Sequence, residues 1–162
     1  MAKKKGKKGL PPGSKIITSN RKARHDYFVE DTYEAGIILV GSEVKSLREG
    51  RVSLTDAYAY FRGNELWFVN AHINPYDKAT HENHEPERPR KLLMHKYELR
   101  RLRGKLQESG LTLIPLALYF KRGIVKVELG LCKGKKLYDK RDDLRRKNHA
   151  RDIERVRRDL HR

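Results

Sequence analysis

The sequence predicts a mainly β protein with two short helices, built as a six-stranded antiparallel β-barrel that is closed or partly open and carries a basic flexible tail at each end. Three observations predict this class. Short runs of β-branched and aromatic residues recur through the middle of the chain, glycine-containing tripeptides join them in pairs, and the strand–helix–strand alternation of a parallel sheet does not occur. Small barrels of this kind commonly bind oligonucleotides on their strands and loops.

The first predicted elements are two strands and a helix. Residues 25–31 and 33–41 have the composition of strands. Residues 42–50 begin with a serine that can cap a helix and end with a glycine, and Val44 and Leu47 lie on one helical face between them. We therefore expect a two-turn helix after the first two strands.

Two hairpins supply the remaining predicted strands. Residues 56–61 and 65–70 flank the tripeptide Arg-Gly-Asn, and residues 111–120 and 124–131 flank Lys-Arg-Gly. Glycine provides the backbone conformation that such tight turns need. With the two earlier strands, these four give the six strands of the expected barrel.

Between the two hairpins we expect a long loop and a second helix. Residues 74–90 hold three of the six prolines together with several acids and histidines, which is typical of an exposed loop without a core. Residues 96–107 place Leu99, Leu102 and Leu106 at helical spacing and basic residues on the other faces. The second short helix is predicted there.

Charge divides the 162 residues into three parts. Residues 1–25 hold nine lysines and arginines and no acid, residues 134–162 hold twelve against six acids, and the residues between them are nearly balanced. Segments with few apolar residues and high net charge cannot offset their ordering entropy by burial. We therefore predict a flexible basic arm over 1–15, a folded β-barrel domain over 16–133, and a basic tail over 134–162.

The formal net charge of +17 indicates a polyanionic partner. The longest apolar run, 111–120, is about half the length that a membrane helix needs and contains Pro115. Cys132 is the only cysteine, and the basic N-terminus lacks the apolar stretch of a secretory signal. We expect a cytoplasmic protein with no membrane contact.

The sequence shows little that indicates catalysis. The segment 130–136 is one residue short of a phosphate-binding loop, and Cys132 has no partner cysteine and no convincing neighbouring histidine. His81 and His84 could be combined with nearby acids into a metal site, but an exposed loop is the simpler interpretation. We predict no enzyme activity, no cofactor and no metal.

The richest candidate for binding RNA is residues 20–27, Asn-Arg-Lys-Ala-Arg-His-Asp-Tyr. Cations, an amide, an imidazole and an aromatic ring within eight residues can pair phosphates, read base edges and stack on an unpaired base. The alternative is a strand whose charges are merely exposed. For Glu34 and Glu43, contact with RNA and pairing with an arginine or lysine are equally good interpretations. The polylysine tract 3–8 is expected to act as a nonspecific electrostatic arm.

Five ordered blocks resemble the SmpB (small protein B) family, the bacterial proteins that bind tmRNA, also called SsrA RNA. The blocks are residues 20–27, 34–36, 41–48, 90–93 and 134–141. The resemblance implies a barrel similar to the oligonucleotide-binding (OB) fold. It also implies an adaptor for trans-translation, which binds the tRNA-like domain of tmRNA and delivers it to stalled ribosomes.

The resemblance further implies which residues and partners take part. The RNA-binding residues would be Asn20, Lys22, Arg24, His25, Tyr27, Glu34, Lys45, Arg48, Lys91 and Leu93. Residues of the tail expected to enter the decoding centre of 16S rRNA and the empty mRNA channel are Gly134, Lys135, Lys136, Tyr138, Asp139, Lys140 and Arg141. The elongation factor EF-Tu and alanyl-tRNA synthetase would act with the protein only indirectly, through tmRNA.

The tail can become helical. Asp142 with Arg146 and Asp143 with Lys147 are acid-first pairs four residues apart, which stabilise a helix. The tail has too few apolar residues to hold such a helix on the barrel, so we expect it to be disordered in the free protein and helical on the ribosome. The alternative to an adaptor is a ribosomal protein or another non-catalytic rRNA-binding protein.

Overall fold

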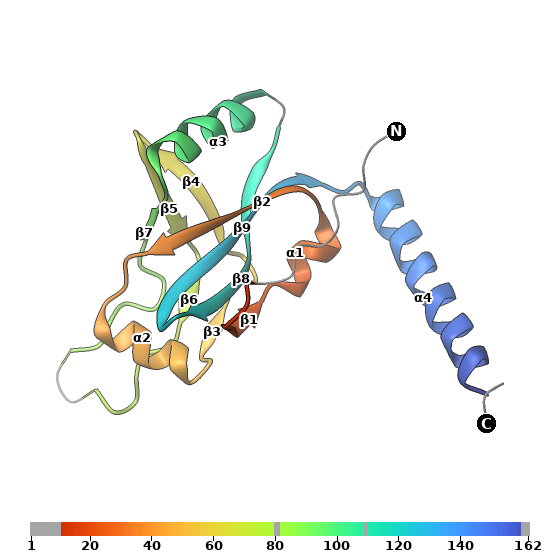
Figure 1. Ribbon diagram of the computed structural model, residues 1–162, viewed down its shortest axis with the longest axis horizontal. Coiled ribbons are helices and arrows are strands. Elements are labelled where there is room, and N and C mark those ends of the chain that lie inside the picture. The colour runs from red at the N-terminus through yellow and green to blue at the C-terminus, as the bar shows by residue number, and fades with distance from the viewer. Residues whose placement is uncertain (1–10, 80–81, 109, 160–162) are drawn as a thin grey trace.

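The computed structural model describes residues 11–79, 82–108 and 110–159 (Figure 1). The predicted polylysine arm at 3–8 lies outside the described residues. The strands are β1 (Ser14–Ser19), β2 (Tyr27–Ile37), β3 (Val52–Ser53), β4 (Tyr58–Arg62), β5 (Glu65–Val69), β6 (His72–Ile73), β7 (Arg90–Leu93), β8 (Thr112–Lys121) and β9 (Ile124–Gly134). The helices are α1 (Arg21–Asp26), α2 (Gly41–Arg48), α3 (Lys96–Glu108) and α4 (Leu137–Asp159).

The main sheet is antiparallel and closes into a ring of six strands. Its strand order is β1-β8-β4-β5-β7-β2-β9, and an additional pairing of β8 with β9 joins the two ends of the last six strands. Strand β1 stands outside the ring and pairs with the C-terminal half of β8. Strands β3 and β6 form a separate two-stranded sheet. The predicted number of strands in the ring is therefore confirmed.

The identity of two strands differs from the prediction. Residues 25–31 and 33–41 were expected to be two strands, but Tyr27–Ile37 is one continuous strand, β2, and the sixth place in the ring belongs to β7. His25 lies in α1, a helix that the composition of this segment does not predict. Both hairpins, β4–β5 and β8–β9, and both predicted helices, α2 and α3, are confirmed.

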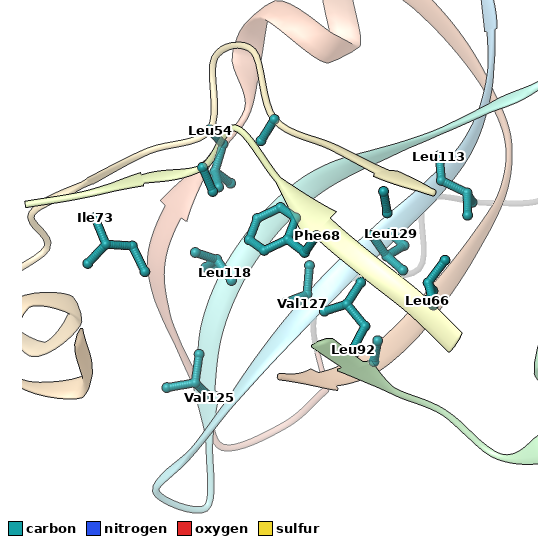
Figure 2. Close-up of a cluster of buried hydrophobic side chains, with 14 of the residues drawn as sticks. Leu54, Leu66, Phe68, Ile73, Leu92, Leu113, Leu118, Val125, Val127 and Leu129 are labelled. Carbon is teal, nitrogen blue, oxygen red and sulfur yellow. The ribbon is translucent and has the colours of Figure 1, made fainter. Parts of the chain in front are cut away.

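Apolar side chains fill the interior of the ring. Phe68, Leu118, Val127 and Leu129 lie at its centre, where side chains of β5, β8 and β9 meet (Figure 2). Burial of each such side chain contributes about 1.5–3 kcal/mol. Helix α3 lies across one end of the ring (Figure 1) and buries Leu102 against this core.

A second, smaller cluster holds α1 against β8 and β9. Ala23 of α1 is buried with Leu116 and Cys132, and Tyr27 packs against this cluster. A Cβ atom at Gly130 would lie 2.9 Å from both the Cys132 sulfur and a Leu116 methyl carbon, closer than carbon and sulfur atoms approach. Glycine at this position therefore lets Leu116 and α1 pack closely on the sheet.

The prediction that the segment 74–90 has no core is wrong for its described residues, 74–79 and 82–90. Arg90 is 0% exposed and His84 is also buried. Glu43 of α2, fully buried as well, accepts hydrogen bonds from Arg90 Nε at 2.7 Å and from Arg88 Nη2 at 2.6 Å. A buried carboxylate shared by two guanidinium groups ties this segment to α2, which the composition alone does not reveal.

Helix α4 extends away from the ring (Figure 1). None of the residues described in it, 137–159, is buried. In the part of the chain that the structure describes, no helix combines the length and the apolar character needed to cross a bilayer.

Candidate RNA-binding surface

The candidate surface follows β2 from one end to the other. Helix α1 immediately precedes this strand, and α2 follows it after a short connection (Figure 1). Eleven residues of extended chain span about 35 Å. Strand β7 pairs with the C-terminal end of β2 through Gly36–Leu93 and Ile37–Leu92. The elements that carry the predicted residues, α1, β7 and α2, therefore border the two ends of β2.

Asn20 forms the cap of α1 and is only 4% exposed. Its side-chain oxygen accepts a hydrogen bond from the Ala23 N–H at 3.0 Å, and its amide nitrogen donates to the carbonyls of Leu54 at 2.9 Å and Pro115 at 3.1 Å. The amide thus joins α1 to the irregular point of β8 next to Pro115. Because both the oxygen and the nitrogen of the Asn20 side chain are hydrogen-bonded within the protein, we infer that Asn20 positions α1.

The cations of α1 are exposed and loosely paired. Lys22 Nζ lies 3.0 Å from the Asp56 carboxylate, and this hydrogen bond raises the pKa of Lys22. Arg24 lies 3.7 Å from Glu128, and its side chain is about half exposed. Exposed pairs of this kind contribute little to stability, so both cations can exchange their carboxylate partners for phosphates at small cost.

Asp26 connects α1 to the base of α4. Its carboxylate accepts from His25 Nδ1 at 2.9 Å and pairs with Lys140 Nζ at 3.0 Å, and the hydrogen bonds from His25 and Lys140 lower the pKa of Asp26. The Asp26 carbonyl accepts from the Lys135 N–H at 2.9 Å, and Lys135 Nζ lies 2.5 Å from Asp143. The start of the tail is therefore attached to the helix that carries the richest group of predicted RNA-binding residues. Sequence reasoning missed this role of Asp26 because nothing in the local pattern indicates a partner over a hundred residues away.

Glu34 is held by two neighbours on the surface of the sheet. It accepts a hydrogen bond from the Tyr119 hydroxyl at 2.6 Å and pairs with Lys121 at 2.9 Å. Burial alone would raise the pKa of Glu34, but the hydrogen bonds from Tyr119 and Lys121 outweigh it and keep the pKa below its ordinary value. Structural pairing, one of the two interpretations from the sequence, is thus present at Glu34, as it is at Glu43.

The far end of the surface carries the remaining predicted residues. Lys91 of β7 pairs with Glu65, and Leu93 is 50% exposed beside Gly36 of β2. On α2, Lys45 lies over the Tyr76 ring at 5.4 Å from its centre, and Arg48 is exposed. Apolar, aromatic and cationic groups thus recur at both ends of β2.

Comparison with known proteins identifies the family. The family model for "SmpB protein" matches residues 17–159. The chain belongs to the SmpB family. An "SsrA-binding protein" of Symbiobacterium thermophilum is 60% identical over 141 residues, covering 86% of this chain and 89% of that protein. An "SsrA-binding protein" of Trichodesmium erythraeum is 54% identical over 157 residues, covering 96% and 97%.

A solved structure described as "tmRNA-SmpB: a journey to the center of the bacterial ribosome" is also similar. It is 55% identical, has a TM-score of 0.63, and the match covers 74% of this chain and 85% of the other. The fold of this SmpB family member is thus related to an SmpB structure by sequence as well as by shape.

The predicted tail residues of this SmpB family member fall into two groups. Some lie where β9 meets the start of α4, and the others lie on α4 itself. Gly134 ends β9 opposite Tyr27, and the Asp139 carboxylate accepts from the Lys136 N–H at 3.2 Å at the start of α4. Tyr138 is 61% exposed, and Arg141 is exposed as well. The base of the tail is therefore anchored, while the side chains beyond it are free to meet another molecule.

The cysteine and histidines that the sequence offered as candidates for catalysis or metal binding do not form such a site among the described residues. Cys132 is fully buried, and burial raises the pKa of its thiol to about 11, so it is protonated and inaccessible at neutral pH. His84 is held by the Ser42 hydroxyl and the Ile73 carbonyl, whereas His81 lies outside the described residues. Over residues 11–79, 82–108 and 110–159, no three His, Cys, Asp or Glu side chains are grouped as a metal site would require.

Proposed function

We propose that this protein is an RNA-binding adaptor of trans-translation. It binds the tRNA-like domain of tmRNA and delivers it to ribosomes that have stalled, so that the stalled chain is tagged and the ribosome is released. The observation that carries the proposal is the set of cationic, apolar and aromatic side chains on α1, α2 and β7 and at the start of β2, in a chain that belongs to the SmpB family. The protein contributes binding and positioning and makes or breaks no covalent bond.

The ring of six strands acts in this proposal as a small OB-fold-like barrel. Such barrels present oligonucleotides with strands and loops on a rigid frame. The barrel domain covers residues 16–133; its apolar interior holds α2 and β7, and the smaller apolar cluster holds α1 against β8 and β9. A rigid frame of this kind recognises a folded RNA by shape, since the phosphates must fit a fixed set of cations.

The residues of the surface have different roles in this proposal. Lys22, Arg24, Lys45, Arg48 and Lys91 pair with phosphates, while His25, Tyr27 and Leu93 contact sugars or bases. Asn20 and Glu34 act indirectly, because their hydrogen bonds within the protein hold α1 and the sheet in place.

The tail, residues 134–162, probes the ribosome. Beyond its anchored base it is largely disordered in the free protein, where α4 forms only part of the time, and it becomes fully helical when Gly134, Lys135, Lys136, Tyr138, Asp139, Lys140 and Arg141 reach the decoding centre and the empty mRNA channel. The absence of any buried residue among those described in α4 supports this, because such a helix gains little burial from the barrel. A channel already filled by mRNA would exclude it.

The partners are tmRNA and the ribosome, with EF-Tu and alanyl-tRNA synthetase brought in through tmRNA, and the setting is the cytoplasm. The second candidate function is a ribosomal protein or another rRNA-binding protein, favoured by the charge of +17 alone.

Sequencing the RNA that co-purifies with the full chain tests the proposal. We expect tmRNA to be enriched over rRNA fragments and other small RNAs, and purified tmRNA to bind the isolated protein with an affinity that falls as salt rises. A protein that travels with intact ribosomal subunits and leaves tmRNA behind would contradict the adaptor and support the ribosomal protein.

A further inference from the structure

A groove of about 700 Å³ lies between helix α3 and strands β5 and β7. The apolar side chains Leu93, Met94 and Leu99 line it together with Lys96 and Arg100 of α3. We call this the α3 groove. Only Leu93 among these five residues belongs to the surface described along β2.

Three cations of α3 line the groove, namely Lys96, Arg100 and Arg103. Within the described parts of the chain, the side chains of Lys96 and Arg100 have no hydrogen bond and no ion pair. They stand four positions apart on one face of the helix, about 6 Å along its axis. By contrast, the neighbouring cation Arg103 is fixed by Asn64 and the Phe61 ring. Unpaired cations at this spacing can meet successive phosphates of one strand.

The apolar side of the groove is exposed enough to receive a ring. Leu93 is half exposed, and Met94 and Leu99 are partly buried behind it. Tyr97, next to Lys96, is 70% exposed, and its ring stacks on His95 with 5.8 Å between the ring centres. An apolar or aromatic surface for a base, with cations for the adjoining phosphates, is the combination that binds unpaired nucleotides.

We propose that the α3 groove and the adjoining Tyr97 bind unpaired nucleotides of tmRNA, with one base against Leu93, a neighbouring base stacked on Tyr97, and the flanking phosphates on Lys96 and Arg100. The proposal rests on the proposed function, because it takes the RNA along β2 to be tmRNA. An acidic peptide would also be attracted by the two cations. RNA is favoured because Leu93 belongs both to the groove and to β7, so an RNA lying along β2 reaches the groove without a break.

The test measures binding of the tRNA-like domain of tmRNA to the full chain over a series of salt concentrations. For Lys96→Ala and Arg100→Ala we expect a several-fold rise in Kd and a log–log salt slope smaller by about 0.7 for each lost phosphate contact. Arg101→Ala is the matched control, since it removes the same charge from the same helix at a position that does not line the groove. Its slope should stay at the wild-type value.

A second pair of variants tests whether an RNA base stacks on the ring of Tyr97. Tyr97→Ala should weaken binding about tenfold, while Tyr97→Phe keeps wild-type affinity, because stacking on one base is worth a factor of this order. Ile124→Ala is the control, since it removes an exposed apolar side chain at the β8–β9 turn that does not line the groove, and it should leave the affinity unchanged. Thermal unfolding of these variants should match the wild type, since both side chains are exposed.

The outcomes separate the two proposals. If the wild-type protein binds the RNA and the Lys96 and Arg100 variants behave like Arg101→Ala, the groove proposal is overturned and the proposed function stands. The groove proposal is also overturned if those variants bind tmRNA normally and lose only ribosomal RNA or a protein partner. If the wild-type protein does not bind the tRNA-like domain, the proposed function itself is overturned.

Discussion

The ring of six strands and helix α4 differ in what stabilises them. A continuous cluster of buried apolar side chains fills the ring, and the buried Glu43–Arg90 pair ties its loops to α2. Helix α4 buries none of the residues described in it and depends on local pairs such as Asp142–Arg145, 3.8 Å apart. The difference shows that the barrel domain, residues 16–133, which we call the body, is rigid before it meets any partner. The conformation of the tail, by contrast, depends on what surrounds it.

The largest expected effect comes from removing the tail altogether. Deletion of residues 134–162 should abolish peptide tagging in a reconstituted trans-translation assay and leave the Kd for tmRNA nearly unchanged, because the surface along β2 remains. The assay compares tagged product from wild-type and truncated protein at saturating tmRNA. A truncated protein that still supports tagging would contradict the assignment of RNA binding to the body and of ribosome recognition to the tail.

The largest expected loss of stability comes from the buried ion pair. Glu43→Ala leaves Arg90 charged, buried and without its carboxylate, which should lower the free energy of unfolding by about 3–5 kcal/mol. Urea denaturation followed by the fluorescence of Trp67 measures the change. Glu154→Ala on α4 is the control and should change it very little, since this residue is exposed.

The lowered pKa of Glu43 predicts how the free energy of unfolding of the body changes with pH. Burial by itself would raise the pKa of Glu43, but the hydrogen bonds from Arg88 and Arg90 outweigh it and lower the pKa below the unfolded value. A group with a depressed folded-state pKa stabilises the fold above its unfolded pKa, about 4.3, and this stabilisation is lost as pH falls toward the folded value. The free energy of unfolding should therefore decline below about pH 4, and more steeply for wild type than for Glu43→Gln. Equal slopes would contradict the role given to this pair.

A smaller effect is expected where α1 packs on the sheet. Gly130→Ala places a methyl group against Leu116 and Cys132, so we expect a loss of about 1–3 kcal/mol and weaker RNA binding as α1 is displaced. Gly104→Ala in α3 is the control, because a Cβ there meets nothing within 4 Å. It should stabilise the helix slightly. Unchanged RNA affinity in a destabilised Gly130→Ala protein would separate α1 from the binding surface.

The smallest effect belongs to the tail. Asp142→Asn removes an exposed pair from α4 and should reduce its helicity by an amount worth about 0.2–0.5 kcal/mol, without changing the unfolding of the body. Far-UV circular dichroism of the full chain and of the truncated chain gives the contribution of the tail by difference. A shift of the main unfolding transition would mean that the tail is packed on the body after all.

Local signals explain which parts of the molecule could be predicted. The β4–β5 and β8–β9 hairpins follow from glycines at the turns between apolar runs, and α2 and α3 follow from helical spacing of leucines and valines. The candidate RNA-binding residues followed from residue types and family blocks, and the structure places them on α1, β2, α2 and β7 and at the cap of α1.

The sequence by itself therefore determined the near-neutral middle of the chain, the basic ends and the residue types suited to a polyanionic partner, because composition and short spacing carry that information. Only the tertiary structure decided that α1 is a helix, since the amide of Asn20 reaches carbonyls 34 and 95 positions away. It also decided that β7 completes the ring and that Glu43 meets an arginine 47 residues distant. Contacts this far apart in the chain form only when the strands close on themselves, and no local pattern specifies them.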